Sequence, residues 1–163
     1  KVLWAPWRMD YSLSQKKNQG CVFCQGLKEE RDEENLILFR GKKAVVFMNR
    51  FPYNNGHLLI MPYRHIGELE ALDSEEVADI HRLICLSLRA LNNAFSPDGF
   101  NIGLNLGKTA GAGVLDHIHW HIVPRWEGDT NFMPVLAETK VMPEHLASTY
   151  QKLRQAFLEE SQK

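Results

Sequence analysis

The chain has 163 residues and a formal net charge of −1 at pH 7, with 24% charged and 44% hydrophobic residues. This composition is typical of a soluble globular protein, and the length suits a single domain. A nearly neutral chain lacks the positive field that attracts nucleic acid, and no apolar run is long enough to cross a membrane, so neither partner is expected. Three cysteines, an odd number, argue against a secreted disulfide framework and predict a cytoplasmic protein.

Within this one domain we expect an N-terminal arm over 1–20, a main body over 21–135 and a C-terminal extension over 136–163. The arm contains two tryptophans in Trp4–Arg8. They would dock either on the body of the same chain or on a partner subunit, and the sequence leaves both possibilities open.

The first half of the body predicts three strands. Asn35–Arg40 and Lys43–Arg50 are both strand-like, and Gly41-Lys42 between them has the length of a two-residue hairpin connection. After a loop over Phe51–Gly56, the apolar run His57–Tyr63 predicts a buried strand.

A long helix is predicted over 74–94. Asp73 is placed as its N-cap and Glu76 follows three residues later, which is the capping-box pattern. On this helix we expect His81 at the surface and Cys85 as a small core filler, neither with a function. Apolar side chains recur at steps of three and four and predict the face that packs on the sheet: Val77, Ile80, Ile84, Leu88 and Leu91.

The second half adds two more strands and a helix. Phe100–Leu106 alternates as a strand, Gly107–Gly113 is a glycine-rich loop, and 117–125 is a further strand. Pro143–Glu160 predicts an amphipathic helix, with the proline suited to its first turn. Strand pairs on either side of one long helix predict an α+β fold with an antiparallel sheet.

The most informative motif is a run of three histidines at every second position, His117, His119 and His121, which we call the histidine row. Strand periodicity places the three imidazoles on one face and the intervening apolar side chains on the other. The Cα atoms of the outer two would lie about 13 Å apart, so one metal ion shared by all three would strain a straight strand. The row better suits an extended anion such as a polyphosphate, and nucleophilic chemistry on phosphorus.

The loop before the row favours an anion site as well. Glycine permits close backbone approach, so Gly111 and Gly113 would bring N–H groups near an anion. The loop is not a phosphate-binding P-loop, because three residues separate Gly103 from Gly107 where that motif has four. Amides that could bind a sugar or a phosphate lie near strand ends or in loops: Asn49, Asn55 and Asn105.

Cys21 and Cys24 have the spacing of half a structural zinc site. The sequence contains no second pair, so the remaining ligands would be histidines, and His57, His65 and His117 are available. Two alternatives stay open. The cysteines could be reduced, with Phe23 packed between them, or they could form a redox dithiol, although no βαβ pattern surrounds them.

Together these motifs resemble the histidine triad superfamily of nucleotide hydrolases and transferases. The family signature His-φ-His-φ-His-φ-φ, where φ is apolar, matches residues 117–123, and the resemblance extends from about Cys21 to Asn131. Val46–Arg50 followed by Gly56-His57 resembles the fragile-histidine-triad branch. Further segments resemble bacterial members described as diadenosine tetraphosphate phosphorylases: Trp4–Arg8, Cys21-x-x-Cys24 and Pro124–Phe132.

The resemblance implies a homodimer whose antiparallel sheets join, with one nucleotide site per subunit. It implies that His119 is a nucleophile that forms a nucleotidyl-histidine, while His121 and His57 hold phosphate oxygens and manage the proton of the leaving group. It further implies that Asn49 holds the ribose and that Asn105 lies on the phosphate side. The implied ligands of a structural zinc ion are Cys21, Cys24, His65 and His117, and Mg²⁺ would accompany the nucleotide.

The expected activity is cleavage of dinucleoside polyphosphates, diadenosine tetraphosphate above all, at the α-phosphate. Many relatives have a glutamine just before the histidines, whereas this chain has Gly113. The difference weakens the interpretation as a simple hydrolase and leaves room for phosphate as the acceptor instead of water. Three alternatives remain: an adenosine 5′-phosphoramidase, a nucleotide-binding module with vestigial catalysis, and a metalloenzyme with all three histidines on one ion.

Overall fold

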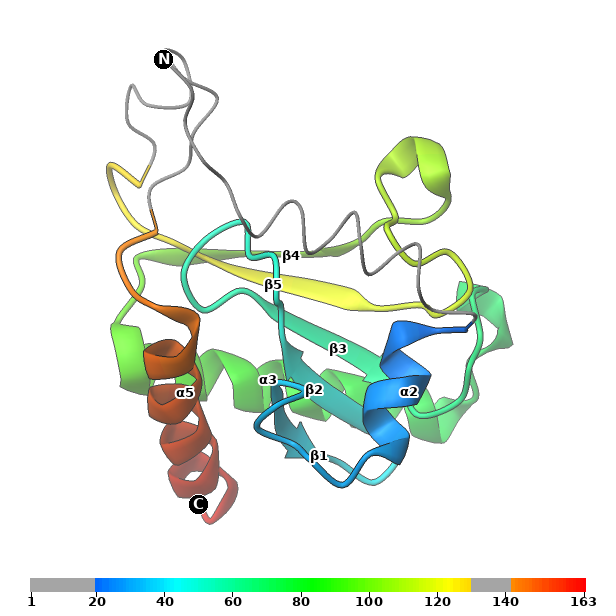
Figure 1. The fold of residues 1–163 in the computed structure, drawn as a ribbon, viewed down its shortest axis with the longest axis horizontal. Helices are drawn as coiled ribbons and strands as arrows, with labels where there is room; N and C mark the ends of the chain where they lie inside the picture. The colour runs from blue at the N-terminus through cyan, green and yellow to red at the C-terminus, as the bar shows by residue number, and fades with distance from the viewer. Residues whose placement is uncertain (1–19, 130–141) are drawn as a thin grey trace.

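A five-stranded sheet, antiparallel throughout, forms the centre of the molecule (Figure 1). The computed structural model describes residues 20–129 and 142–163. In chain order the strands are β1 (Ile37–Arg40), β2 (Ala44–Met48), β3 (Leu58–Pro62), β4 (Gly99–Leu104) and β5 (Trp120–Arg125). Their order across the sheet is β1-β2-β3-β5-β4. The chain therefore inserts β5, which follows the first two histidines of the row, between two other strands.

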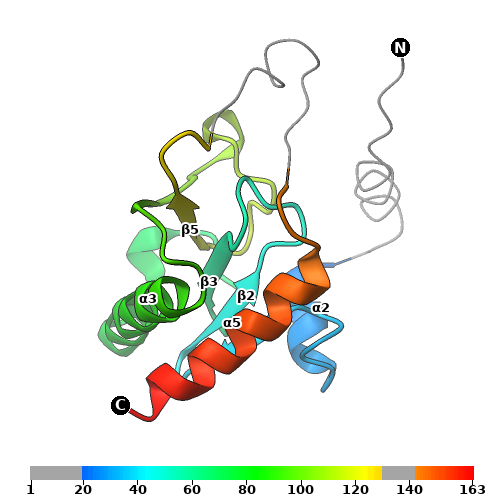
Figure 2. The ribbon, with the colours of Figure 1, turned by 90° about the vertical axis from the view of Figure 1, so that its left-hand side faces the viewer.

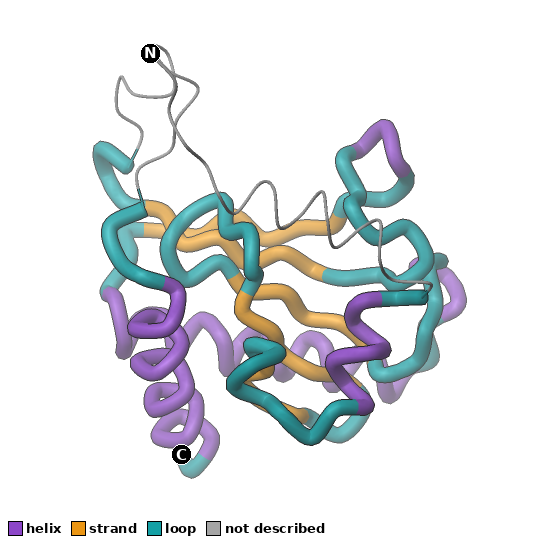
Figure 3. The backbone as a smooth tube through the Cα atoms, viewed as in Figure 1, coloured by secondary structure: helices purple, strands orange, loops and turns teal. Residues whose placement is uncertain are grey.

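Helices cover both faces of the sheet (Figure 2). The long helix α3 (Ser74–Phe95) and the C-terminal helix α5 (Leu146–Ser161) pack on one face, where α3 contacts β2 and β3 and α5 contacts β1. The short helix α2 (Val22–Lys28) lies on the other face. Single 3-10 turns occur at Leu69–Ala71 and at Lys108–Ala110, and Figure 3 shows the latter on a loop that projects beyond the sheet.

Two apolar clusters hold these layers together. The larger one lies between the sheet and the pair α3 and α5, and it includes Ile60, Leu83 and Phe157, all fully buried. The smaller one lies on the α2 face and is built from alternate residues of β1, β2 and β3, with Phe23 packed against it. Burial on both faces explains why β2 and β3 are continuous apolar runs.

The predicted capping box is present. The Asp73 side chain accepts a hydrogen bond from the Glu76 N–H at 2.8 Å, and the Glu76 carboxylate accepts one from the Asp73 N–H at 3.0 Å. Arg64 binds the same Glu76 carboxylate at 2.6 and 2.8 Å. These bonds hold the pKa of the Glu76 carboxyl below its ordinary value, with Arg64 as the main cause.

Asp79 on α3 fixes the hairpin between β1 and β2. Its carboxylate accepts hydrogen bonds from the backbone N–H groups of Lys43 and Ala44 at 2.7 and 3.0 Å. Burial alone would raise the pKa of this carboxyl, but those bonds and Arg82 hold it below its ordinary value. A Cβ at Gly41 would lie 2.7 Å from the same carboxylate, so the hairpin requires glycine there.

The predicted buried face of α3 is wrong at one residue. Val77 is 52% exposed, whereas Ile80 and Leu91 are buried and Ile84 and Leu88 are partly buried against the core. The face is rotated because α5 also packs on α3, so Leu83 and other positions between the predicted ones are buried instead. His81 is exposed as expected, and Cys85 is only partly buried.

Several strands and helices begin or end at other residues than the sequence predicted. The β1–β2 connection spans Gly41–Lys43, one residue longer than predicted, and β4 begins and ends before Phe100–Leu106 does. Pro143 precedes the last helix instead of opening it, because His145 is still extended and the helix begins at Leu146. The Trp4–Arg8 segment lies outside the described residues. In the described part of the chain, no helix is both long and apolar enough to cross a membrane.

Candidate active site and metal centre

The histidine row runs into β5, but only its last member lies in the sheet ladder. Ile118 donates its N–H to the Ile66 carbonyl at 2.7 Å, so the first two histidines precede the strand, which begins at Trp120. His121 pairs with Leu59 on β3 and with Gly103 on β4. The predicted strand over 117–125 is thus too long at its start.

The alternation of the two faces nevertheless holds. Ile118 and Ile122 are buried, and Trp120 packs against the main core. The rings of His119 and His121 lie with centroids 5.0 Å apart on the opposite side. The row is therefore a continuous line of imidazoles, as the periodicity predicted.

His119 is held in one tautomer by its own backbone. Its Nδ1 lies 2.8 Å from the His117 carbonyl oxygen, and a carbonyl only accepts, so Nδ1 carries the hydrogen. Nε2 is then left with a lone pair, and none of the described residues bonds it. The residue is 7% exposed, and this burial lowers the pKa of the imidazole, although the bond to the carbonyl opposes the shift. The result is a neutral imidazole with one reactive nitrogen.

His57 and His121 form a directed pair. The Tyr53 N–H donates to Nδ1 of His57 at 3.0 Å, and the Asn49 amide lies 3.2 Å from the same nitrogen. Since Nδ1 accepts, Nε2 of His57 carries the hydrogen and donates to Nδ1 of His121 at 2.9 Å. His121 must then carry its own hydrogen on Nε2.

That Nε2 atom of His121 is buried and has no hydrogen-bond partner among the described residues. Burial, and to a lesser extent His119, lower the pKa of His121 to about 4, so its ring is neutral at pH 7. An unpartnered buried N–H costs free energy unless a ligand accepts from it. The His121 side chain is therefore a neutral hydrogen-bond donor next to the His119 ring, and a bound ligand could supply its acceptor.

Aromatic rings flank the two ends of the row. Phe23 from α2 contacts His117 and His119 edge-on, with centroids 5.6 and 5.2 Å apart. Tyr53 stacks almost parallel to His121, at 5.7 Å and 10°. Phe23 thus packs against His119 from α2, while Tyr53 covers the ring of His121 at the other end of the row.

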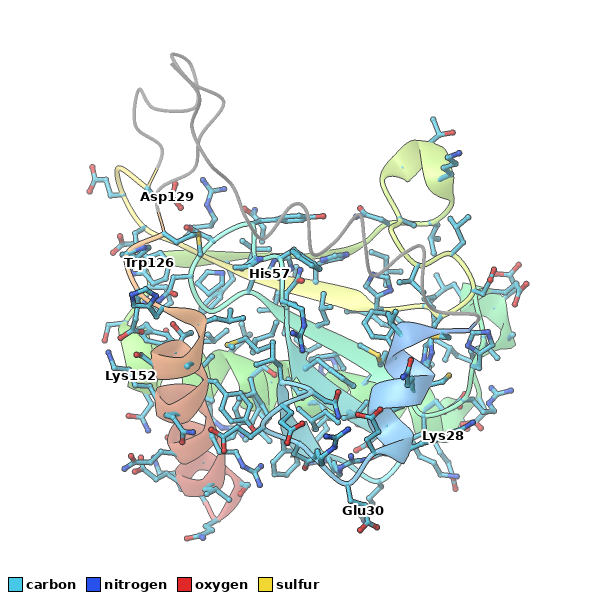
Figure 4. All side chains as sticks on the ribbon, viewed as in Figure 1. Lys28, Glu30, His57, Trp126, Asp129 and Lys152 are labelled. Atoms are coloured by element: carbon cyan, nitrogen blue, oxygen red, sulfur yellow. The ribbon has the colours of Figure 1, made fainter. Side chains whose placement is uncertain are left out.

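A cavity of about 460 Å³ opens beside His121, over the exposed face of β4 and β5. Asn101 and Asn105 line it from the β4 side and Arg125 from β5. Arg125 binds Asp129 through two bonds of 2.8 and 3.0 Å and donates to the Asn101 side chain. Figure 4 shows His57 over the middle of the sheet and Asp129 in the loop beyond the end of β5. His119 itself does not line this cavity.

At the other end of the row, two cysteines and two histidines converge. The sulfur of Cys21 lies 3.4 Å from Nδ1 of His117, and that of Cys24 lies 3.6 Å from the same atom and 3.4 Å from Nδ1 of His65. All four ligand atoms lie within 4.8 Å of one another. The residues come from α2, from the segment after β3 and from the start of the row.

This cluster fits a zinc ion. A tetrahedral Cys₂His₂ donor set with ligand atoms a few ångströms apart is the usual structural zinc arrangement. Nε2 of His117 lies 2.9 Å from the Pro62 carbonyl and so carries the hydrogen, which turns the lone pair of Nδ1 toward the sulfurs. Burial and the neighbouring Cys21 raise the pKa of the Cys24 thiol, and a zinc ion would reverse that effect by deprotonating its ligand.

The other predicted residues divide into two groups. Asn105 lines the cavity, and its amide lies 3.8 Å from where a Cβ on Gly111 would be. The Asn49 side chain bonds His57 and the Phe51 N–H, and Gly113 is exposed in the loop without lining the cavity. Asn55 is outside the site: it is buried and accepts from the Thr149 hydroxyl on α5.

Several side chains that shape the cavity were not predicted from the sequence, among them Asn101 on β4. Tyr53 and Asn54 sit in a loop whose glycine and proline indicated only a turn, and Arg125 and Asp129 lie where the strand ends. The one available signal was the pair of opposite charges at i and i+4, which the structure joins as a salt bridge.

Fold and site together define a class of protein: an antiparallel α+β domain with a line of imidazoles whose last member, His121, lines an open cavity. The sequence model of the HIT domain matches residues 30–128, and the chain belongs to this histidine triad family as a nucleotide-processing enzyme. A relative named AP-4-A phosphorylase, from Mycobacterium tuberculosis, is 40% identical over 154 residues, which cover 90% of this chain and 79% of the relative.

Solved structures agree with this assignment. A zinc-bound histidine triad family protein from Mycobacterium smegmatis superposes with a TM-score of 0.70 at 27% identity, covering 88% of this chain and 96% of the other. A hypothetical histidine triad nucleotide-binding protein from Sulfolobus tokodaii gives 0.67 at 26% identity, covering 87% and 92%. The predicted family and the predicted fold of the single chain are confirmed.

Proposed function

We propose that this enzyme cleaves dinucleoside polyphosphates, with diadenosine tetraphosphate as the first substrate to test, by transferring a nucleotidyl group to Nε2 of His119. The observation that carries the proposal is the bond from Nδ1 of His119 to the His117 carbonyl, which leaves Nε2 as the only basic ring nitrogen. The printed name of the 40% identical relative supports the substrate class.

The first step forms a bond between Nε2 of His119 and the α-phosphorus while the bond to the leaving oxygen breaks. The electron pair goes to the leaving polyphosphate, whose oxygen accepts a hydrogen bond from Nε2–H of His121. The nucleotidyl-imidazole is cationic, and its Nδ1–H remains bonded to the His117 carbonyl. Asn105 and the backbone of the loop at Gly111 and Gly113 would hold the phosphate oxygens.

In the second step an acceptor oxygen attacks the same phosphorus and the electron pair returns to Nε2 of His119. We propose inorganic phosphate as the acceptor. Gly113 has no side chain that could orient an attacking water, and the relative's name is that of a phosphorylase. With diadenosine tetraphosphate the products would be ATP from the first step and ADP from the second.

Cys21, Cys24, His65 and His117 would hold a structural zinc ion. The ion would join α2 to the start of the histidine row, and it would take no part in the transfer. We also propose a homodimer that joins two sheets at β4. This strand is at one edge of the sheet, and Ile102 on it is 45% exposed.

Replacing the nucleophile tests the mechanism. His119→Ala should lose turnover of diadenosine tetraphosphate while it still binds AMP, and His81→Ala, which removes an exposed histidine on α3, should behave like the wild type. Wild-type enzyme mixed with substrate in the absence of phosphate should accumulate an acid-labile adenylyl adduct, and added phosphate should convert it to ADP. Unchanged turnover in His119→Ala would refute the mechanism.

The same assay separates the rival activities. Turnover of adenosine 5′-phosphoramidate without any turnover of diadenosine tetraphosphate would identify a phosphoramidase. Tight AMP binding with no adduct would identify a binding module. Formation of AMP at the same rate with and without phosphate would make water the acceptor.

A further inference from the structure

The cavity beside His121 begins where the histidine row ends and continues along the same face of β5. Side chains on that face follow at every second residue, so His121, Val123 and Arg125 lie in line, and all three line the cavity. His119 lies on the opposite side of His121 and outside the cavity. A phosphorus attacked by His119 would therefore have the cavity on its far side, next to the N–H of His121.

An in-line displacement expels its leaving group on the side opposite the nucleophile. The cavity is on that side, and the donor that the leaving oxygen needs stands at its entrance. The part of the substrate that departs, and not the part retained on His119, would thus occupy the cavity.

The cavity is open beside His121 because β4 presents no side chain at Gly103. Gly103 is paired with His121 across the two strands, and a Cβ built on Gly103 meets no atom within 4 Å. Directly paired residues have Cβ atoms about 5 Å apart, so any side chain at this position would stand beside the His121 ring and fill the space. The glycine is in an ordinary strand conformation, since it is absent from the positive-φ residues. Backbone geometry does not require glycine here.

The charges indicate what the cavity holds. Arg125 is neutralised by its two bonds to Asp129, which also accepts from the Asn54 amide. The remaining polar groups are neutral amides, including Asn101. A nearly neutral surface with several amide groups suits a nucleoside better than a further run of phosphates, and the volume of about 460 Å³ is within the range of small-molecule sites. The exposed ring of Tyr53, stacked on His121, supplies a flat surface at one side.

We propose that this cavity is a subsite for the nucleoside of the leaving nucleotide, kept open by Gly103, so that the enzyme selects substrates by what departs from the α-phosphorus. The inference rests on the proposed function, because it requires transfer through His119. It concerns a different part of the substrate, and it assigns a specificity role to a residue that has no side chain.

The test compares two adenylyl donors that retain the same adenylyl group and differ in what leaves. Diadenosine tetraphosphate releases a nucleotide, whereas adenosine 5′-phosphoramidate or its imidazolide analogue releases a small amine. In Gly103→Val the ratio of kcat/KM for the first donor to that for the second should fall about tenfold or more, because the new side chain occupies only the departing group's space.

Gly99→Val is the matched control. Gly99 lies on the same face of β4 but is paired with Arg125, at the end of the cavity away from His121. Its Cβ would also meet no atom within 4 Å, and it does not line the cavity, so a valine there leaves the space beside His121 open. This variant should keep the wild-type ratio, and circular dichroism should show both variants folded. If Gly103→Val does not fold, Gly103→Ala gives the same comparison with a smaller expected fall.

An equal fall with both donors in Gly103→Val would overturn the inference, since the cavity would then hold the retained nucleoside or the variant would disturb His121 itself. An unchanged ratio would also overturn it. Failure of the proposed function would be seen separately, as a wild-type enzyme that does not cleave diadenosine tetraphosphate at all.

Discussion

The two ends of the histidine row use the same side chain for opposite purposes. His117 is fully buried, with one ring nitrogen bonded to the Pro62 carbonyl and the other directed at two sulfurs. His121 receives a hydrogen bond from His57 on one nitrogen and has no partner on the other among the described residues. Both ring nitrogens of His117 therefore have contacts, whereas only one ring nitrogen of His121 does among the described residues.

The difference comes from the surroundings of each ring. At the first end, α2 covers the row and brings the cysteines and Phe23 with it. At the second end, β4 offers only Gly103 beside His121, and the loop residue Tyr53 is 51% exposed. Equal spacing in the sequence thus gives one imidazole with contacts at both nitrogens and one with an unpartnered donor, and removing either should have a distinct effect.

The largest effect should follow from His121→Leu, which keeps the size of the side chain but removes the donor at Nε2. Turnover should fall about 10²–10⁴-fold, the usual contribution of a positioned proton donor, while the zinc content stays at the wild-type level. Steady-state rates and metal analysis measure both. A variant that lost its zinc as well would show that the two ends are not independent.

The next largest effect should follow from loss of the metal. Cys21→Ser combined with Cys24→Ser should abolish zinc binding and lower the free energy of unfolding by about 4 kcal/mol at a zinc concentration a thousand times Kd. Chemical denaturation with and without a chelator gives the value. Because the proposed ion would lie outside the reaction path, turnover at low temperature should fall less than in His121→Leu. Zinc that survived in this variant together with zinc-dependent activity would favour an ion bound by the histidine row.

The smallest effect concerns pH. The pKa of His121 is lowered to about 4 from an ordinary 6.5, so the unfolded chain takes up this proton before the folded one. Its contribution to stability is complete above pH 6.5 and is lost as the pH falls toward 4. The unfolding free energy of the wild type should therefore fall relative to that of His121→Leu as the pH decreases over that window. Nuclear magnetic resonance should show the His121 ring titrating near pH 4, and a midpoint near 6.5 would contradict the burial of this ring.

Local signals predicted the elements that depend on nearby residues. The Asp73 and Glu76 capping box, the alternation within the histidine row and the convergence of the cysteines with His65 all follow from spacing or from the family resemblance, and the structure contains each of them. Contacts between distant segments were not predictable in this way. The rotation of α3 that exposes Val77 depends on α5, which lies far along the chain.

The same limit applies to the site. The sequence identified the histidines of the row but not the direction of their hydrogen bonds. The tautomers of His117 and His121 depend on the Pro62 carbonyl and on His57, which lie far away in the sequence. Asn49 illustrates this: the resemblance assigned it to the ribose, and the structure bonds its amide to His57. The open space over Gly103 could not be predicted from the sequence either, because a glycine within a strand does not indicate whether a cavity lies above it.

The bond from His119 to the carbonyl of His117 has a consequence for genetics. In many enzymes a carboxylate side chain orients the reactive histidine, and a substitution there reveals it. Here the orienting group is a main-chain oxygen. No codon change removes it, so a complete scan of substitutions would find the proposed nucleophile without ever finding what directs it. Chemical synthesis that replaces the carbonyl of residue 117 would be needed to expose this dependence.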